Sequence, residues 1–231
     1  MINANLDRCL SFINSQSAPA AHAAAAVGLR RAVTISRQAG CGGVLVAEKL
    51  ANFLQQHSPA QSPTWTVFDR DLMNQVLADH NLPSHLEKFL PEDRVSAIED
   101  TLADIFGVRP TARTIVQQTA ETMLKLAELG GVILIGRGGN IVTGKLPHVL
   151  HVRLVAPLAD RIERVCRDDH QTPDAARKFC LDEEAARTRF LKTYFNANIN
   201  DPELYHLVIN TSRMGYDAAA QVIADAVRRL P

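Results

Sequence analysis

The chain has little that would draw it to a polyanion or to a membrane. Its 231 residues carry 25 lysines and arginines against 25 aspartates and glutamates, so the formal net charge is zero. A balanced charge gives no overall attraction for nucleic acid or anionic lipid, although a local basic cleft is compatible with it. No apolar run approaches the roughly 20 residues that a membrane helix needs. We therefore expect a soluble protein that binds neither nucleic acid nor membrane.

Cysteine is scarce and shows no metal-binding pattern. The four cysteines have neither C-x-x-C spacing nor a Cys/His metal spacing, and no long apolar signal sequence precedes them. Free thiols in a reducing compartment are the simplest interpretation. The sequence thus predicts a cytoplasmic protein without metal-ligating residues.

The apolar content favours one α/β domain. Apolar residues make up 46% of the chain, which is enough for a real core at this length. Residues 1–29 combine a short helical pattern with an Ala-rich stretch, and we expect an N-terminal helix and arm there. Residues 30–231 would form the compact domain. The sequence leaves a homo-oligomer open.

Short β-branched runs alternate with helical patterns along this domain. Strands are expected at residues 32–36, 65–68, 132–135, 148–155 and 207–210, and helices at 44–54, 158–167 and 216–230. A polar helical region at about 72–128 is too long for one crossover and predicts an all-helical insertion. Strands that alternate with helices predict a parallel sheet with ligand sites at the carboxyl ends of its strands.

A glycine-rich loop follows the first predicted strand. Gly40, Gly42 and Gly43 stand between strand and helix, where a backbone can approach a phosphate and a helix N-terminus offers free N–H groups. The order predicts a phosphate-binding loop near residues 36–45. In the full motif G-x-x-x-x-G-K-[ST], however, Gly43 would replace the lysine and Val44 the hydroxyl residue. A plain turn that needs positive φ would use the same glycines, so this alternative remains.

Four segments in one order carry a resemblance: residues 34–43 (TISRQAGCGG), 68–72 (FDRDL), 135–140 (IGRGGN) and 201–212 (DPELY to VINTS). Together they resemble the cytidylate kinase-like family, a branch of the nucleoside monophosphate kinases, over roughly residues 31–228. The resemblance implies an α/β fold, namely a P-loop NTPase-type three-layer sandwich with a parallel sheet. It also implies a helical substrate lobe at about 72–128 and a lid at about 160–200.

The resemblance also implies a set of site residues. Asp69, Arg70 and Arg137 would bind the acceptor, a nucleoside monophosphate such as CMP. ATP would be the phosphoryl donor, with Mg²⁺ held mainly by phosphates and water. The donor phosphates would lie against Ser36, Arg37, Gly40, Cys41, Gly42, Gly43 and Val44, and the catalytic arginines would be Arg37, Arg161, Arg164 and Arg187.

Some positions depart from the family pattern. Val44 stands where this branch commonly has arginine, and Ile135 and Gly138 stand where cytidylate kinases have aspartates. No acidic residue ends the strand at 132–135. Two functions therefore remain: a nucleotide kinase-like enzyme, and a catalytically weak nucleotide- or anion-binding module with a regulatory or scaffolding role. Arginines that converge on one cleft would favour the enzyme, whereas arginines held in salt bridges would favour the module.

Several residues also have purely structural explanations. Arg161, Arg164 and Arg167 share roughly one helix face, which is either functional or a solvated ion-pair surface with Glu163 and Asp168. The thiol of Cys41 either has a lowered pKa in an electropositive loop or stands in for a serine. Asp69 would serve equally as a helix cap. The sequence favours structural roles for His148 and His151, and core positions for Met73, Met123 and Met214.

Overall fold

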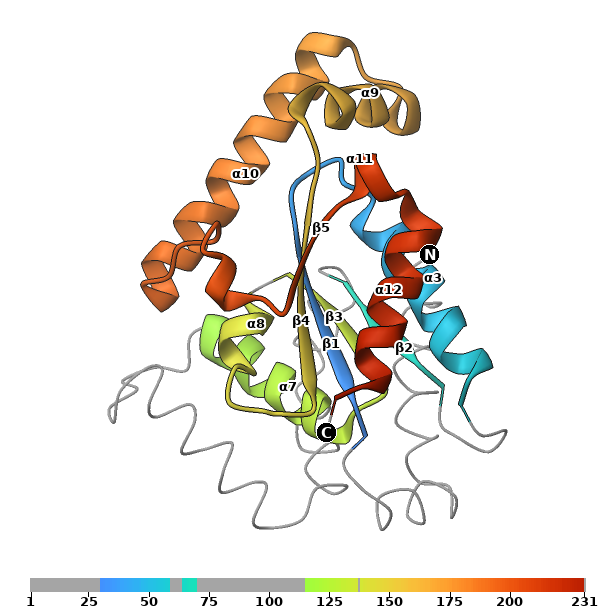
Figure 1. Ribbon diagram of the computed structural model, residues 1–231. Coiled ribbons are helices and arrows are strands. Elements are labelled where there is room, and N and C mark those ends of the chain that lie inside the picture. Colours follow the sequence, from blue (N-terminus) through green and yellow to red (C-terminus); the bar gives the residue numbers. More distant parts are fainter. Residues whose placement is uncertain (1–29, 59–63, 70–114, 137, 231) are drawn as a thin grey trace, which may run out of the picture.

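The computed structural model describes residues 30–58, 64–69, 115–136 and 138–230 (Figure 1). Five parallel strands form one sheet in the order β2-β3-β1-β4-β5. They are β1 (Ala32–Arg37), β2 (Thr66–Phe68), β3 (Val132–Ile135), β4 (Val149–Val155) and β5 (Leu207–Asn210). Each lies within one residue of a predicted strand, because the β-branched runs that suit a buried strand are bounded by turn residues. The predicted parallel α/β architecture is confirmed.

Helices cover both faces of the sheet, and each face has its own buried apolar cluster. Val33 and Ile35 of β1 pack with α3 (Gly43–Gln56) and α12 (Tyr216–Arg228), whereas Ala32 packs with α7 (Ile115–Leu129) (Figure 1). The alternation follows from the two-residue period of a strand. Burial of one such side chain contributes roughly 1.5–3 kcal/mol, so the three layers hold together through this core.

The α7 side of the sheet also carries polar residues. Thr34 and His151 are buried on neighbouring strands, and Oγ1 of the threonine lies 2.9 Å from Nδ1 of the histidine. His148 is buried as well, and its Nε2 lies 3.1 Å from the carbonyl oxygen of Ala127. Both histidines are thus buried and bonded within the protein, as a structural role predicts, although Nδ1 of His148 has no hydrogen-bond partner among the described residues.

Two helices stand above the carboxyl end of the sheet, where the sequence predicts a lid. They are α9 (Leu158–Asp169) and α10 (Pro173–Phe195), and α10 descends beside the strand ends (Figure 1). The side chain of Thr172 accepts from the Ala175 amide and Pro173 occupies the first turn, which is a typical helix start. Shorter helical turns are α8 (Gly139–Val142), η1 (Pro202–Leu204) and α11 (Thr211–Met214).

Parts of the predicted organisation fall outside the described residues. These parts are the N-terminal arm, Met73 and most of the helical insertion, of which α7 is the described end. The division into a domain, a substrate lobe and a lid stays a prediction. Met123 is buried as expected, but the core position predicted for Met214 is wrong, because 42% of its surface is exposed beside the Gly215 turn. Within the described ranges, no helix has the length and apolarity to cross a membrane.

Candidate functional site

The predicted glycine loop joins β1 to α3. Gly40 and Gly42 have φ values of 76° and 72°, a region that other residues seldom adopt, and Gly42 is the N-cap of α3. The predicted strand–loop–helix order is therefore observed. Val44 lies in the first turn of the helix and is 45% exposed, so this end of α3 is open to solvent on one side.

The loop glycines are also required by the protein's own packing. A Cβ atom on Gly40 would lie 2.7 Å from the carbonyl oxygen of Arg161, and one on Gly42 would lie 2.5 Å from the ring of Tyr216. On Gly43 it would lie 3.0 Å from Cγ of Arg37. The structural explanation of these glycines is thus satisfied without a ligand. It does not exclude phosphate binding, because a tight turn and an anion cradle use the same backbone.

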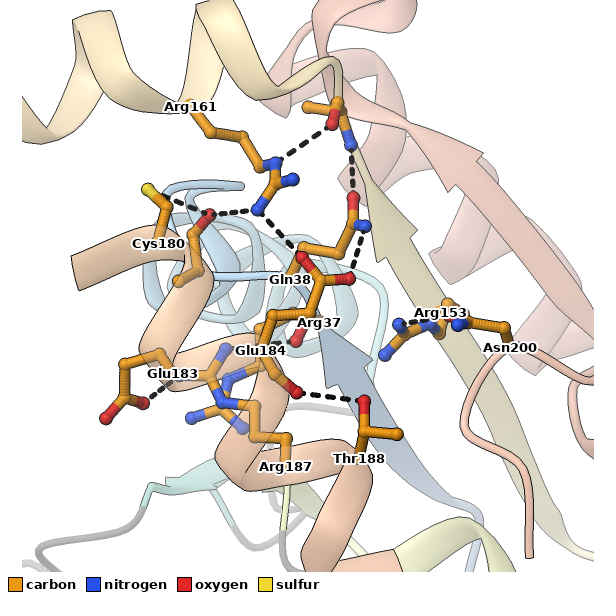
Figure 2. Close-up of polar contacts among 12 residues, drawn as sticks. Arg37, Gln38, Arg153, Arg161, Cys180, Glu183, Glu184, Arg187, Thr188 and Asn200 are labelled. Carbon is orange, nitrogen blue, oxygen red and sulfur yellow. Dashed lines mark hydrogen bonds and ion pairs between the residues drawn. The ribbon is translucent and has the colours of Figure 1, made fainter. Parts of the chain in front are cut away.

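Helix α10 is docked on this loop by polar contacts (Figure 2). Glu184 lies between two donors, Nε2 of Gln38 at 2.8 Å and Nη1 of Arg161 at 3.0 Å. Arg187 donates from Nη1 to the carbonyl oxygen of Arg37 at 3.1 Å and from Nη2 to Glu183 at 2.8 Å. Glu184 and Arg187, three positions apart on α10, therefore form the contact between this helix and the loop.

The three arginines of α9 that share one face have different surroundings. Arg161 is only 5% exposed and pairs with Glu184, whereas Arg167 is exposed and pairs with Asp168. Nη1 and Nη2 of Arg164 donate to Thr211, Nη2 also donates to Ser212, and its guanidinium lies 5.3 Å from the ring centroid of Tyr216. The sequence left two explanations for these arginines, a functional face and a solvated ion-pair surface. Only Arg167 fits the solvated ion-pair surface.

A cavity of about 220 Å³ opens under α10 at the carboxyl ends of β1 and β3. Arg37 and Arg187 both line it. The Arg37 side chain reaches the turn after β3, where a Cβ atom on Gly136 would lie 2.2 Å from its Nη1. The wall combines these cations with hydroxyl, amide and apolar groups. Its other described residues are Thr34, Ile35, Ser36, Ile135, Gly136, Gly138, Gly139, Asn140, Glu183, Ala186, Phe190, Leu191 and Ile199.

A buried arginine that the sequence analysis missed lies beside this cavity. Arg153 of β4 is 2% exposed, and it donates to Oγ of Ser36 at 2.9 Å. It also donates to Oδ1 of Asn200 at 3.1 Å (Figure 2). Its guanidinium also lies 6.0 Å from the ring centroid of Tyr205. Burial lowers the pKa of this guanidinium. The available signal was a charged residue in the middle of a buried strand, because arginine is seldom buried unless it is paired.

The structure brings together some of the predicted site residues. Ser36 and Arg37 line the cavity with Arg187, whereas the loop residues from Gly40 to Val44 form the adjoining turn. Asp69 follows β2 at the same edge of the sheet, but it is not part of the cavity wall. Arg70 and Arg137 lie outside the described residues. All of these assignments remain proposals.

Cys41 has its side chain in the core. It is fully buried among residues of α3, α12 and the sheet, so only its backbone is placed to meet a phosphate. Burial raises the pKa of this thiol, and the nearby Arg161 and Arg164 oppose that effect without overcoming it. Of the two explanations, the small-residue role fits better than a reactive thiolate.

The described residues provide few ligands for Mg²⁺. Within the described ranges, no group of three or more His, Cys, Asp or Glu side chains is placed to hold a metal ion. Glu183 is the acidic residue of the described cavity wall, and it already accepts from Arg187. Magnesium needs several oxygen ligands, so these residues do not form a protein-held magnesium site.

Known proteins resemble this chain in sequence and in fold. A segment of 113 residues is 32% identical to the uronate isomerase of Corynebacterium glutamicum, but it covers 49% of this chain and only 22% of that enzyme. A segment of 120 residues is 25% identical to the cytidylate kinase of Methanocaldococcus jannaschii and covers 51% of this chain and 67% of that kinase. An uncharacterized protein from Eubacterium ventriosum has a similar fold, with a TM-score of 0.58 at 16% identity over 86% of this chain and 98% of that one.

The family model covers most of the chain. The model described as the cytidylate kinase-like family matches residues 32–213. This range runs from the start of β1 through α11 and contains both glycine-rich turns and the described cavity wall. The chain therefore belongs to the cytidylate kinase-like family.

Proposed function

We propose that this protein transfers the γ-phosphoryl group of ATP to a small acceptor, a nucleoside monophosphate such as CMP. The observation that carries the proposal is that Arg37 and Arg187 line one cavity beside the glycine loop. In-line phosphoryl transfer depends on alignment and on cancellation of negative charge. Two guanidinium groups at one wall supply positive charge. Arg187 also donates to Glu183 and to the carbonyl oxygen of Arg37, and a guanidinium has further N–H groups for phosphate oxygens.

Each part of the site would then have a separate task. The backbone of the glycine loop and the first turn of α3 would hold the donor phosphates. The cavity would hold the acceptor, with its apolar wall at Phe190 and Leu191 against the acceptor's ring. ATP would bring its own Mg²⁺, because the described residues do not form a site for the ion. We assign no step to the metal.

A second function is favoured by a different observation. Arg161 is buried in an ion pair with Glu184, and Arg164 is bound to the turn at Thr211 and Ser212. Neither arginine would reach a phosphate without giving up these contacts. With Gly43 and Val44 in place of the loop lysine and hydroxyl, the chain would instead be a nucleotide- or anion-binding module with a regulatory or scaffolding role.

One experiment separates the two functions. We would incubate the protein with ATP, Mg²⁺ and each nucleoside monophosphate, measure diphosphate product, and measure binding of the same nucleotides by calorimetry. Arg187→Ala is expected to lower turnover by about 100-fold, because it removes a charge worth several kcal/mol at the reacting phosphates. Arg189→Ala is the matched control, since Arg189 is exposed on the same helix and is not a described part of the cavity wall.

The outcomes differ clearly between the two functions. Product formation that depends on Arg187 but not on Arg189 supports the kinase and names its acceptor. Saturable nucleotide binding without product supports the binding module. Folded protein that binds no nucleotide contradicts both.

A further inference from the structure

The cavity wall contains a buried amide without a hydrogen-bond partner. Asn140 of α8 lines the cavity and is only 6% exposed. Its Nδ2 makes no hydrogen bond with any part of the chain that the structure describes. Buried amide groups nearly always have a partner, because an unpaired N–H has lost its water without compensation. An acceptor atom of a ligand in the cavity would supply that partner.

Ser36 offers a second donor on the same wall. Its Oγ accepts from Arg153, and an arginine can only donate. The hydroxyl of Tyr205 lies 3.4 Å from the same Oγ, but it also lies 2.9 Å from the carbonyl oxygen of Ile199, which can only accept. The single proton of Tyr205 is therefore used at Ile199. None of the described contacts of Ser36 takes up its own proton, which is therefore available to a ligand.

The remaining polar groups of the described wall do not offset these donors. Thr34 is bonded to His151, and the carboxylate of Glu183 is bonded to Arg187. Arg153 has no carboxylate among its described hydrogen-bond partners, and the carboxylate that acts on its charge is the more distant Glu184. What the wall presents to a ligand is thus a set of donors beside cations, which is complementary to an anion.

We propose that Asn140 and Ser36 together bind the phosphate group of the acceptor, and that Arg153 is a positioning residue that orients the proton of Ser36. Asn140 would donate from Nδ2 and Ser36 from Oγ, while Arg153 adds positive potential from behind the wall. The inference deepens the proposed function and rests on the cavity being the acceptor site. It does not require that phosphoryl transfer takes place.

Binding of CMP and of inorganic phosphate, measured by calorimetry, tests the role of Asn140. Asn140→Ala is expected to weaken binding about 10- to 100-fold, the range for a hydrogen bond to a charged group. Asn140→Asp should weaken it more than alanine does, because a carboxylate cannot donate and repels the phosphate. The control Gln56→Glu makes the same amide-to-carboxylate change at an exposed position of α3 and should leave binding unchanged. Binding to Asn140→Asp that matches or exceeds binding to Asn140→Ala would overturn the assignment.

A measurement on the unchanged protein covers the case in which a variant does not fold. In protein labelled with ¹⁵N at asparagine, the side-chain N–H resonances of Asn140 should shift on titration with CMP and with phosphate. A shift with both probes identifies the phosphate group as the ligand, and a shift with CMP alone assigns Asn140 to the nucleoside and overturns the proposal. Resonances that stay unmoved while CMP binds overturn it as well.

A double-mutant cycle tests the role of Arg153. If Arg153 acts through Ser36, then Arg153→Gln should weaken phosphate binding about 10-fold in the wild-type background and have little further effect in Ser36→Ala protein. A purely structural role predicts equal loss in both backgrounds. Failure of this inference is distinct from failure of the proposed function. The binding experiments measure only how the cavity holds a phosphate, whereas phosphoryl transfer is measured only by product formation.

Discussion

Nη1 of Arg187 donates a hydrogen bond of 3.1 Å to the main-chain carbonyl oxygen of Arg37, so helix α10 is attached to the end of the central strand β1. Both side chains then line the same cavity. One contact therefore positions two cations, and the position of α10 determines whether they face a ligand together. Residues that hold α10 in place should matter for the site even where they do not line it.

Glu184→Ala should destabilise the protein by about 3 kcal/mol, because it leaves the buried Arg161 without its counter-charge. The free energy of unfolding in urea measures the change. Asp182→Ala is the control on the same helix, since the Asp182–Lys178 pair is exposed and should contribute little. Equal effects of the two substitutions would show that the Glu184 pair does not hold the lid.

Gly42→Ala should destabilise the protein by more than backbone strain alone explains. Gly42 has a φ of 72° and a ψ of 31°, where alanine is strained by about 1–2 kcal/mol, and a Cβ atom there would also overlap the Tyr216 ring. Urea unfolding of Gly42→Ala in the wild-type and Tyr216→Leu backgrounds isolates the packing effect, which the smaller leucine should partly relieve. An equal loss in both backgrounds would show that backbone strain alone explains the loop glycine.

Stability should fall as the pH is lowered from about 6.5 to 4, because of His151. Burial and the neighbouring His206 lower the pKa of His151 to about 4, whereas an unfolded histidine has a pKa near 6.5. Between these values the unfolded chain binds the extra proton, so acidification favours unfolding by up to about 3 kcal/mol. His151→Gln should flatten this dependence when unfolding is measured across the range. The exposed His57 provides the control variant His57→Gln, which should retain the slope.

The described cysteines should differ in their reaction with a thiol reagent. Cys41 and Cys180 are buried and burial raises the pKa of both thiols, whereas Cys166 is partly exposed. Since the thiolate is the reacting form, Cys166 should be labelled first in folded protein at pH 7. Peptide mapping after timed labelling gives the order, and denatured protein serves as the reference. Early labelling of Cys41 would contradict this prediction and show that its thiol is reactive despite being buried.

Local sequence patterns were sufficient for the strands and for the loop. The run Val132–Ile135 is apolar throughout and bounded by glycines, so its place as a buried strand follows from composition alone. The glycine turn after β1 likewise depends on residues that are close in sequence. The resemblance to the kinase-like family placed Arg37 and Arg187 in one site, but spacing alone would not have done so, because 150 positions separate them.

Tertiary structure decided which polar side chains belong to the cavity. Helical spacing gave Arg161 and Arg164 the same face, yet one is bound to Glu184 and the other to the turn at Thr211. The charge of Arg153 in a buried strand was a local signal, but the sequence did not place it or Asn140 at a cavity, since the partner or cavity that explains each comes from another strand or helix. The sequence alone determined where the chain turns and which strands are buried. Only the folded chain determined which charges meet, because hydrogen bonds and ion pairs form between atoms whose separation depends on the packing of distant elements.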